Sequence, residues 1–353
     1  MIMIIIVHFS QNFELDGLFG LFCAYCQMGV QCFFMLSAYS LCKSYAATPR
    51  PYLSFLKHRI SKILPTYWLM IVINIIIHFL LTTFQIQVAY NTSTDLLSIL
   101  INVFLLNGLV PFANNNVVFG GWFIGTIVIL YALFPIFYRF YEISKKQNLI
   151  PFSGAALSFF LCLVFFCVNY FILQNGGAAW RFGNNSFFYN SFINQLSAFL
   201  LGFNLYYLID ASSKEAMIAS RNKNLLLSIG FLIISLFMFS TSQEFLFTVL
   251  PLTSALSWMY FYLFLEGRKE KDKSTILQKA LAYNGKNSLY IYLIHSIFVW
   301  GFFDWLRTWL INGNLVMNDS IVLGLLIIPL YVLILAFAHC FKAVASQIKL
   351  KID

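Results

Sequence analysis

The sequence predicts an all-α integral membrane protein, a bundle of about ten transmembrane helices with one additional half-length helix. Of its 353 residues, 60% are hydrophobic and only 10% are charged, and the mean hydropathy is +0.80. Soluble domains carry about 25% charged residues, so this composition excludes a soluble globular protein and is typical of a chain that lies in lipid. The spacing of the apolar runs and the placement of the basic residues support the same class.

Nine apolar runs are long enough to cross a membrane. A bilayer core about 30 Å thick requires about 20 apolar helical residues. The runs that meet this requirement cover residues 18–42, 62–82, 119–140, 150–174, 190–209, 223–241, 245–265, 283–303 and 318–341. No internal repeat or soluble segment separates them, so we expect one integral-membrane domain over residues 1–353.

Two further apolar segments are shorter than a span. Residues 1–9 would cover about 13 Å as a helix, and we interpret them as the outer half of a first span whose inner half is missing, because of a late-assigned start or a fragment. Residues 96–112 include Asn102, Asn107 and Pro111. We interpret this segment as a re-entrant or half-length helix, which is tolerated at membrane depth when protein or a water-filled cavity covers it.

The basic residues fall in alternate loops once 96–112 is taken as non-spanning. Most of the 22 Lys and Arg residues lie in the segments 43–62, 139–146, 214–223, 268–279 and 342–351. Cytoplasmic loops collect Lys and Arg, so these segments and both termini are predicted to be cytoplasmic. Arg181 and Arg307 lie in outer loops, and Lys286 lies just inside a span.

Histidines inside the predicted spans are the first candidates for chemistry, because ionisable residues are costly in a membrane and are usually functional there. His8 and His295 both fall in the outer halves of their helices, His295 about 18 Å above Tyr283. Two imidazoles at similar depth are expected to share one cavity. A single histidine at the inner end of a span is more often a packing residue, which is our interpretation of His339.

The other histidines and the cysteines predict no site. His58 lies in a basic loop and His78 at the outer end of a span. The seven cysteines lie in or beside apolar runs, which indicates no disulfide framework. Cys23 and Cys26 form a C-x-x-C pair without a second ligand pair nearby, so we expect packing residues and no metal site.

Five stretches, in order, resemble the membrane acyltransferase family 3, the integral-membrane O-acyltransferases that modify bacterial surface sugars. "IIIVHFSQ" is similar to the family's first span with its catalytic histidine, and "GVQCFFMLSAYSL" to its G-V-x-x-F-F-x-x-S-G-F/Y run. "FLKHRISKILPTYW" resembles its basic loop, and "GGWFIGTIVILYALFP" its span beginning with tryptophan and ending with proline. "NGKNSLYIYLIHSIFVW", the fifth, is similar to its G-K/R-x-S-L/Y-x-I/L-Y-L-x-H helix. In addition to these five, "NQLSAFLLGFNLYY" resembles the family's F-L/F-x-G segment.

The sequence departs from the family pattern at three places. The family's first helix carries an arginine eleven residues before the histidine, and here that position lies before Met1. Ala38 replaces the usual glycine after Ser37, and the glutamate that some members carry after Trp122 is absent. If the chain is made as written, the resemblance to the family implies an inactive homologue.

The resemblance implies transfer of an acyl group, expected to be acetyl, from cytoplasmic acyl-CoA to a hydroxyl of a surface polysaccharide or lipid-linked sugar. The implied location is a bacterial cytoplasmic membrane, with acyl-CoA as a co-substrate, no bound cofactor and no nucleic-acid partner. His8 would be the catalytic residue, either as the general base that removes the hydroxyl proton or as a transient acyl carrier. The sequence leaves both routes open.

Acyl-CoA carries several phosphate charges, so basic residues near the cytoplasmic face are candidates for binding it. Lys57, Arg59 and Lys62 form one such group, since arginine can pair with phosphate bidentately, and Lys286 could also reach a phosphate. The alternative is that the first three only orient the chain in the membrane and that Lys286 only extends to the interface. Asn284, Asn287 and Ser288 around Lys286 also offer a helix N-cap.

Polar side chains at a plausible depth could line the active site, and we expect this of His295, Ser37, Trp122, Tyr131, Asn190 and Gln195. The alternative is that they are contacts between helices. Two other classes also stay open. A multi-pass transporter or exporter of a polysaccharide-related substrate would fit ten spans with one interrupted segment, although no inverted repeat is detected. The second of these classes is a non-catalytic scaffold or an inactive truncated homologue. Within the enzyme class, transfer of another acyl group or transfer to an amine also stays open.

Overall fold

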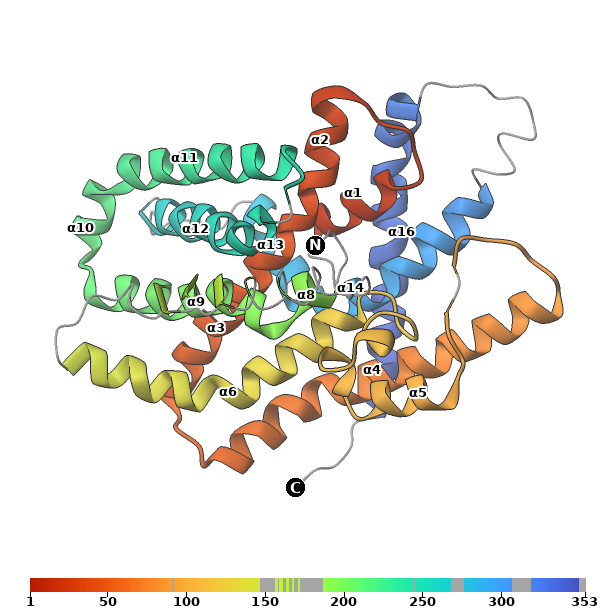
Figure 1. Ribbon diagram of the computed structural model, residues 1–353, viewed down its shortest axis with the longest axis horizontal. Coiled ribbons are helices and arrows are strands. Elements are labelled where there is room, and N and C mark those ends of the chain that lie inside the picture. Colours follow the sequence, from red (N-terminus) through yellow and green to blue (C-terminus); the bar gives the residue numbers. More distant parts are fainter. Residues whose placement is uncertain are drawn as a thin grey trace. The chain divides into compact units, whose positions relative to one another are not determined.

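A computed structural model describes residues 1–90, 92–146, 187–243, 245–267, 276–306 and 319–348, with isolated positions between 156 and 171. Every regular element in these residues is helical, and none of them is a strand (Figure 1). Because lipid offers the backbone no hydrogen-bond partners, a helix, which satisfies its own amides, is the expected solution for such apolar runs. The predicted polytopic helical bundle is confirmed.

Eight helices among the described residues are long and apolar enough to cross a membrane. They match eight of the nine predicted runs, and the ninth, 150–174, lies largely outside the described residues. The elements that form these spans are α2 (Gly17–Tyr25) with η1 (Cys26–Met28) and α3 (Gly29–Ala47), α4 (Tyr52–Thr83), α6 (Gly121–Lys146), α8 (Phe187–Asn190) with α9 (Phe192–Ala211), α11 (Arg221–Ser240), α12 (Leu246–Glu266), α14 (Ser288–Ser296) with η5 (Ile297–Phe302), and α16 (Asp319–Gln347).

The two short apolar segments form short helices. Residues 2–9 of the first segment lie in α1 (Ile2–Ser10), with Met1 at its N-cap. The second segment contains α5 (Leu96–Val103), followed by the 3₁₀ turns η2 (Leu106–Gly108) and η3 (Pro111–Ala113). At 1.5 Å per residue, α5 covers about 12 Å, much less than a bilayer core. The segment 96–112 therefore has the half-length form that the distribution of basic residues predicts.

The segment 43–62, expected to be a loop, is mostly helical. Helix α3 continues to Ala47 and α4 begins at Tyr52, which leaves only 48–51 between them. The bounds of the predicted spans came from apolar composition, but a helix continues beyond the apolar run wherever its polar side chains can reach water. Apart from Arg50, which lies in this short connection, the basic residues of the segment therefore lie on helix ends.

Contacts divide the chain into two compact units, each built from separated stretches of sequence. The first unit comprises Met1–Gly29, Lys57–Gly125 and Lys273–Asp353, and the second comprises Val30–Leu56 and Thr126–Asp272. Both units include residues outside the described ranges, among them 268–275 of the predicted basic segment 268–279 and the outer-loop arginines Arg181 and Arg307. The single domain expected over 1–353 stays a prediction.

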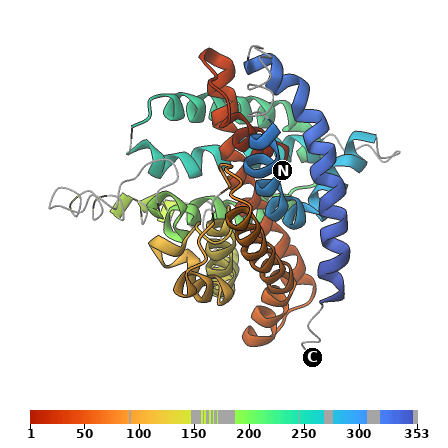
Figure 2. The ribbon, with the colours of Figure 1, turned by 90° about the vertical axis from the view of Figure 1, so that its right-hand side faces the viewer.

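In the first unit, α1 is enclosed by α2, η1, α14, η5 and α16. The side chains of Ile4, Ile5 and Phe9 are almost completely buried. Helices α14 and α16 lie side by side, as Figures 1 and 2 both show. The short α1 is thus held inside protein, which brings its histidine next to the helix that carries the second histidine.

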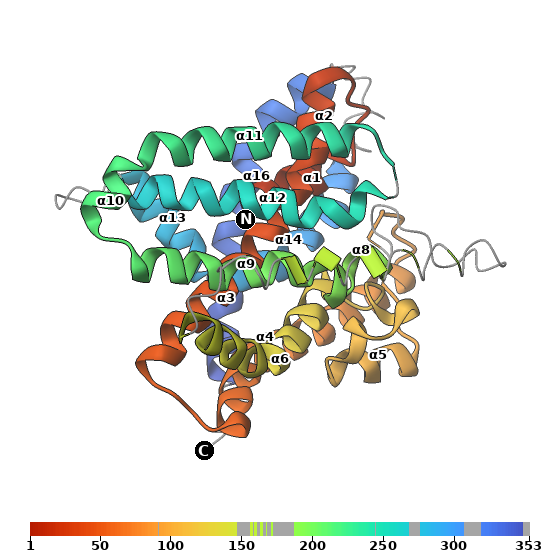
Figure 3. The same cartoon turned by 60° about the vertical axis from the view of Figure 1, so that its left-hand side comes forward.

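In the second unit, α9, α12 and α11 lie side by side (Figure 3). Helices α11 and α12 exchange two hydrogen bonds, from the Ser228 hydroxyl to the Ser257 carbonyl and from the Ser257 hydroxyl to the Ser228 carbonyl, each 3.0 Å long. Small polar residues of this kind allow close helix approach in a membrane.

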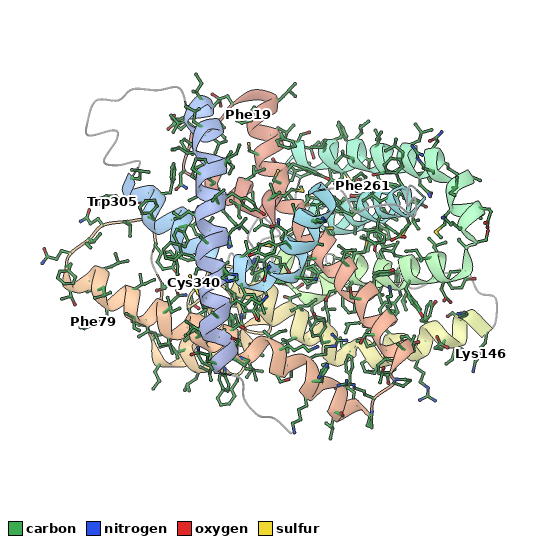
Figure 4. All side chains as sticks on the ribbon, turned by 180° about the vertical axis from the view of Figure 1, so that it is seen from behind. Phe19, Phe79, Lys146, Phe261, Trp305 and Cys340 are labelled. Carbon is green, nitrogen blue, oxygen red and sulfur yellow. The ribbon has the colours of Figure 1, made fainter. Side chains whose placement is uncertain are left out.

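Large apolar side chains cover the outer surfaces of several spans. On α16, Leu325, Ile328 and Val332 are exposed at helical spacing and form one stripe. Phe79 and Trp305, labelled in Figure 4, also extend outward from the first unit. Such surfaces are unfavourable in water and are expected where lipid is the solvent, so the chain is a multi-pass membrane protein.

Candidate active site

The structure brings His8 of α1 and His295 of α14 together in the first unit. Their ring centroids lie 5.2 Å apart and the rings are tilted by 31°. The two residues are distant in sequence, and the contacts of α1 with α14 and η5 place them side by side. Two imidazoles from separate helices thus lie in contact within an apolar bundle.

His295 is held by the backbone of its own helix. Its Nδ1 atom contacts the carbonyl oxygen of Tyr292. Because a carbonyl oxygen only accepts, Nδ1 must donate, so in the neutral ring the lone pair is on Nε2. His295 is only 1% exposed, and its Nε2 atom has no hydrogen-bond partner among the described residues. This leaves one buried basic nitrogen available.

His8 is oriented from one side and covered from another. Its Nδ1 atom lies 3.2 Å from the Oε1 atom of Gln11, one turn further along the chain. An amide oxygen also only accepts, so this arrangement assigns the proton to Nδ1 and the lone pair to Nε2. The ring is half-buried, and the Trp300 ring meets it edge-on at 4.8 Å.

Trp300 reaches His8 because the helix after His295 is a π-helix, η5. On an α-helix, residues five apart, such as His295 and Trp300, lie about 140° apart around the axis. The wider π turn reduces that angle, so both rings lie beside His8. The Asn12 side chain donates to the carbonyl of Val299 in η5, at 3.4 Å, and so connects the end of α1 to this turn. Sequence reasoning missed Trp300, because an apolar run does not indicate a π turn. It also missed Gln11, the residue at the C-cap of α1.

A turn at Gly120 supports the histidine pair by holding the side chain of Tyr292. The Tyr292 hydroxyl donates to the carbonyl of Gly120 at 2.9 Å, and the Gly120 N–H donates to Oδ1 of Asn115 at 2.6 Å. Gly120 has φ +79, and a Cβ atom there would lie 2.7 Å from the Tyr292 hydroxyl oxygen. Only glycine fits both the backbone conformation and the space.

The helix that carries His295 begins later than the sequence predicts. The expected span starts at 283, but α13 (Ile276–Lys286) ends first and α14 begins at Ser288. His295 therefore lies about 10 Å above the start of its helix rather than 18 Å. Asn287 occupies the N-cap position, yet its side chain makes no capping bond.

The side chain of Asn287 bonds in two other directions. It donates to the Tyr283 carbonyl at 2.9 Å and accepts from Nζ of Lys342, also at 2.9 Å. Lys286 is exposed at the end of α13, so Lys342 of α16, which the sequence did not single out, is the cation bound into this turn. Asn284 also accepts a hydrogen bond from the Tyr331 hydroxyl.

The other predicted residues divide between the two units. Lys57, Arg59 and Lys62 lie on the first turns of α4, and Trp122 lies on the first turn of α6. In the second unit, Ser37 pairs with Tyr131 at 2.7 Å. Gln195, also in the second unit, accepts from Gln31 at 2.9 Å and donates to the Tyr189 carbonyl, while the Asn190 carbonyl accepts from Thr126. These bonds within the second unit are of the kind that stabilises contacts between membrane helices.

Among the described residues, no group of three His, Cys, Asp or Glu side chains could hold a metal ion, and the six cysteines in this part of the chain are free.

The fold and the site together define a polytopic membrane protein with a histidine pair inside its bundle. A family model described as an acyltransferase domain, acyltransferase family 3, matches residues 1–340. The chain belongs to this family of membrane acyltransferases. No curated protein and no solved structure shows significant similarity to it.

Proposed function

We propose that this acyltransferase moves an acetyl group from cytoplasmic acyl-CoA to a hydroxyl of a surface polysaccharide or lipid-linked sugar in a bacterial cytoplasmic membrane. The observation that supports this proposal most is the contact between His8 and His295, with the Nε2 atom of His295 buried and without a hydrogen-bond partner in the described part of the chain. Buried polar atoms are normally paired. An unpaired imidazole nitrogen inside an acyltransferase is suited to hold or remove a proton during the reaction.

The proposed step needs one base and no cofactor. His8 Nε2 removes the proton from the acceptor hydroxyl while its oxygen attacks the thioester carbonyl. The tetrahedral oxyanion then collapses, the carbon–sulfur bond breaks, and the proton on His8 passes to the departing thiolate. His295 presents a lone pair beside His8 and acts as a positioning residue that favours the protonated form of His8 during the step. In the alternative route, His8 accepts the acyl group first and then passes it to the hydroxyl.

The donor would bind at the start of α4. Lys57, Arg59 and Lys62 lie within two turns there, and they belong to the same unit as the histidine pair. Phosphate oxygens pair well with such cations, and with arginine bidentately. Both termini and these residues are proposed to lie on the cytoplasmic side, since that side collects basic residues.

The experiment uses the full chain in proteoliposomes with radiolabelled acetyl-CoA and an envelope glycan extract as acceptor. We expect His8→Ala to reduce label transfer by about 10²- to 10⁴-fold, the usual contribution of a general base. The matched control is His339→Ala, which removes an exposed histidine from α16 and should leave transfer unchanged. Wild-type transfer in His8→Ala would contradict the proposal.

The same preparation distinguishes direct transfer from the acyl-histidine route, and an acyltransferase from a transporter. A burst of thiol equal to the enzyme concentration, in the absence of acceptor, would indicate the acyl-histidine route. Its absence would indicate direct transfer. Movement of a glycan across the membrane without acyl-CoA would instead favour a transporter.

A further inference from the structure

A pocket in the first unit is not used by the proposed chemistry. Its volume is about 490 Å³, within the range of roughly 300–1,000 Å³ that is typical of small-ligand sites. It lies where α4 ends and the following segment turns back. The residues that line it are His78, Leu81, Thr82, Gln85, Ile86, Gln87, Val88 and Tyr90.

The lining is polar but carries no acidic group and no Lys or Arg. Four side chains, those of His78, Thr82, Gln85 and Gln87, can form hydrogen bonds with a ligand. The Thr82 hydroxyl donates to the His78 carbonyl at 2.8 Å, so its oxygen remains as an acceptor. Such a surface suits a neutral ligand with many hydroxyl groups better than a phosphate or a carboxylate.

Gln85 has a conformation that its residue type disfavours. It follows the end of α4 with φ 52, and its N–H bonds to the Thr82 carbonyl while the N–H of Ile86 bonds to the Leu81 carbonyl. This is the Schellman pattern, in which the left-handed position is usually glycine. Strained residues of this kind concentrate at ligand sites. A glutamine at this position therefore points to a role for its amide in the pocket.

Tyr90, which lines the pocket, is connected to the histidine pair by three successive ring contacts. The Tyr90 ring lies 5.2 Å from that of Phe119, Phe119 lies 4.8 Å from Trp300, and Trp300 lies 4.8 Å from His8. The Tyr90 hydroxyl donates to Asn74 at 2.5 Å. Burial raises the pKa of Tyr90 far above its ordinary value, so its hydroxyl stays neutral.

The segment that lines the pocket is also joined to the helix that carries the site, through Ala89, which lies between the lining residues Val88 and Tyr90. The N–H of Ala89 donates to Oδ2 of Asp304 at 2.8 Å, and Asp304 lies one residue beyond Phe303, the C-cap of η5. The pocket also lies at the opposite end of α4 from the basic residues, because Arg59 and Thr82 are roughly 35 Å apart along a helix. A ligand in the pocket and a donor at the basic end would therefore approach the histidine pair from opposite sides of the membrane.

We propose that this pocket is an acceptor subsite that binds a neutral glycosyl unit of the sugar chain and presents a neighbouring hydroxyl to the histidine pair. The inference rests on the proposed acyltransfer to a sugar and adds where the sugar binds. Amide and hydroxyl side chains would bind the glycosyl hydroxyl groups, and the segment 84–90 would select the sugar.

The experiment measures glycan binding without acyl-CoA, on the full chain in nanodiscs. The probes are neutral trisaccharides of glucose, galactose, rhamnose and N-acetylglucosamine, a sialylated trisaccharide, and vesicles of anionic phospholipid. We expect at least one neutral trisaccharide to bind and Gln85→Gly to weaken that binding about tenfold, the loss expected for one or two hydrogen bonds. Gln85→Asn keeps an amide and tolerates the left-handed conformation, so it should retain part of the binding.

The chain offers a matched control at another helix end. Ser242 follows α11 in the second unit with φ 54, so Ser242→Gly relieves the same kind of backbone strain without changing the pocket. Both glycine variants should unfold at the same temperature as the parent chain or higher, which separates lost binding from lost folding. Only Gln85→Gly should lose the sugar.

Several results would overturn the proposal. They are binding of none of the neutral trisaccharides, preference for the sialylated probe, displacement of the sugar by the phospholipid vesicles, or unchanged binding in Gln85→Gly. His8→Ala is measured in parallel for thiol release and for glycan binding. If sugar binds and His8→Ala transfers the acyl group undiminished, the proposed chemistry is refuted and the acceptor subsite is retained. If His8→Ala loses transfer but no sugar binds to the chain, the acceptor subsite is refuted and the proposed chemistry is retained.

Discussion

Gly120 supports the histidine site through Tyr292, and replacing it with alanine is a sharp test of that support. The new Cβ would lie 2.7 Å from the Tyr292 hydroxyl oxygen and 2.9 Å from Cζ, so the ring would have to move. The backbone at φ +79 also disfavours any residue with a Cβ. Movement of Tyr292 would break its bond to Gly120 and shift the carbonyl that holds Nδ1 of His295.

The cost of Gly120→Ala can be estimated from these parts. A left-handed alanine costs about 1–2 kcal/mol, overpacking about 1–3 kcal/mol, and the lost hydrogen bond about 1 kcal/mol. We therefore expect a loss of about 3–6 kcal/mol in the free energy of unfolding, together with a large fall in acyl transfer. The assay is unfolding in detergent followed by tryptophan fluorescence, with transfer measured on the same samples.

Two further variants make this test specific. Gly230→Ala places a Cβ in open space on α11 and should be neutral or stabilising by up to about 1 kcal/mol. Adding Tyr292→Phe to Gly120→Ala removes the atom nearest the new Cβ, so the double variant should recover part of the stability. If Gly120→Ala unfolds like the parent chain, the proposed support of His295 by this turn is wrong.

Three other predictions concern the rest of the molecule. Hydrogen bonds from the Ser93 hydroxyl and the Ser98 N–H lower the pKa of Asp95. The ionised Asp95 carboxylate therefore stabilises the folded state above the ordinary carboxyl pKa of about 4, and this stabilisation is lost as the pH falls through the lowered pKa. Asp95→Asn should reduce the acid dependence of unfolding, and an unchanged pH profile would exclude this contribution. Gly202→Ala would place a Cβ against the Met35 carbonyl and 2.6 Å from Cβ of Ala38, and should cost about 1–3 kcal/mol in unfolding, with Gly230→Ala as its control. Neutralising Lys57 and Arg59 together should raise the KM for acetyl-CoA several-fold, and an unchanged KM would leave them only an orienting role.

The spans could be predicted because the membrane restricts what an apolar run can form. A run of about 20 apolar residues must satisfy its backbone internally, so it becomes a helix wherever it lies in the bundle. The half-length form of 96–112 was also predictable, because counting it as a span would have put the lysines at 145 and 146 on the wrong side. Helix ends were less predictable, since α4 begins at Tyr52, well before its apolar run over 62–82, and α14 begins only after Asn287.

The two histidines could be identified from the sequence because an imidazole in lipid requires a reason. The residues around them could not. Trp300 lies beside His8 only because η5 has a π turn, and no apolar pattern distinguishes a π turn from an α turn. Gly120 and Gly121 are adjacent and identical in type, and only the structure shows which of them has the left-handed backbone.

Composition and charge thus determined that this protein is a multi-pass helical membrane protein and which side chains were unusual in it. Tertiary structure decided which of those side chains meet. Ser37 and Gln195 were predicted near the active site from depth alone, and that stays a prediction; the structure shows their bonding partners, Tyr131 for Ser37 and Gln31 for Gln195, all in the second unit. The depth of a side chain in the membrane follows from its position along the helix, whereas the side chains that it contacts depend on how each helix is rotated about its axis. Helices that are apolar on every face leave that rotation unspecified until they pack.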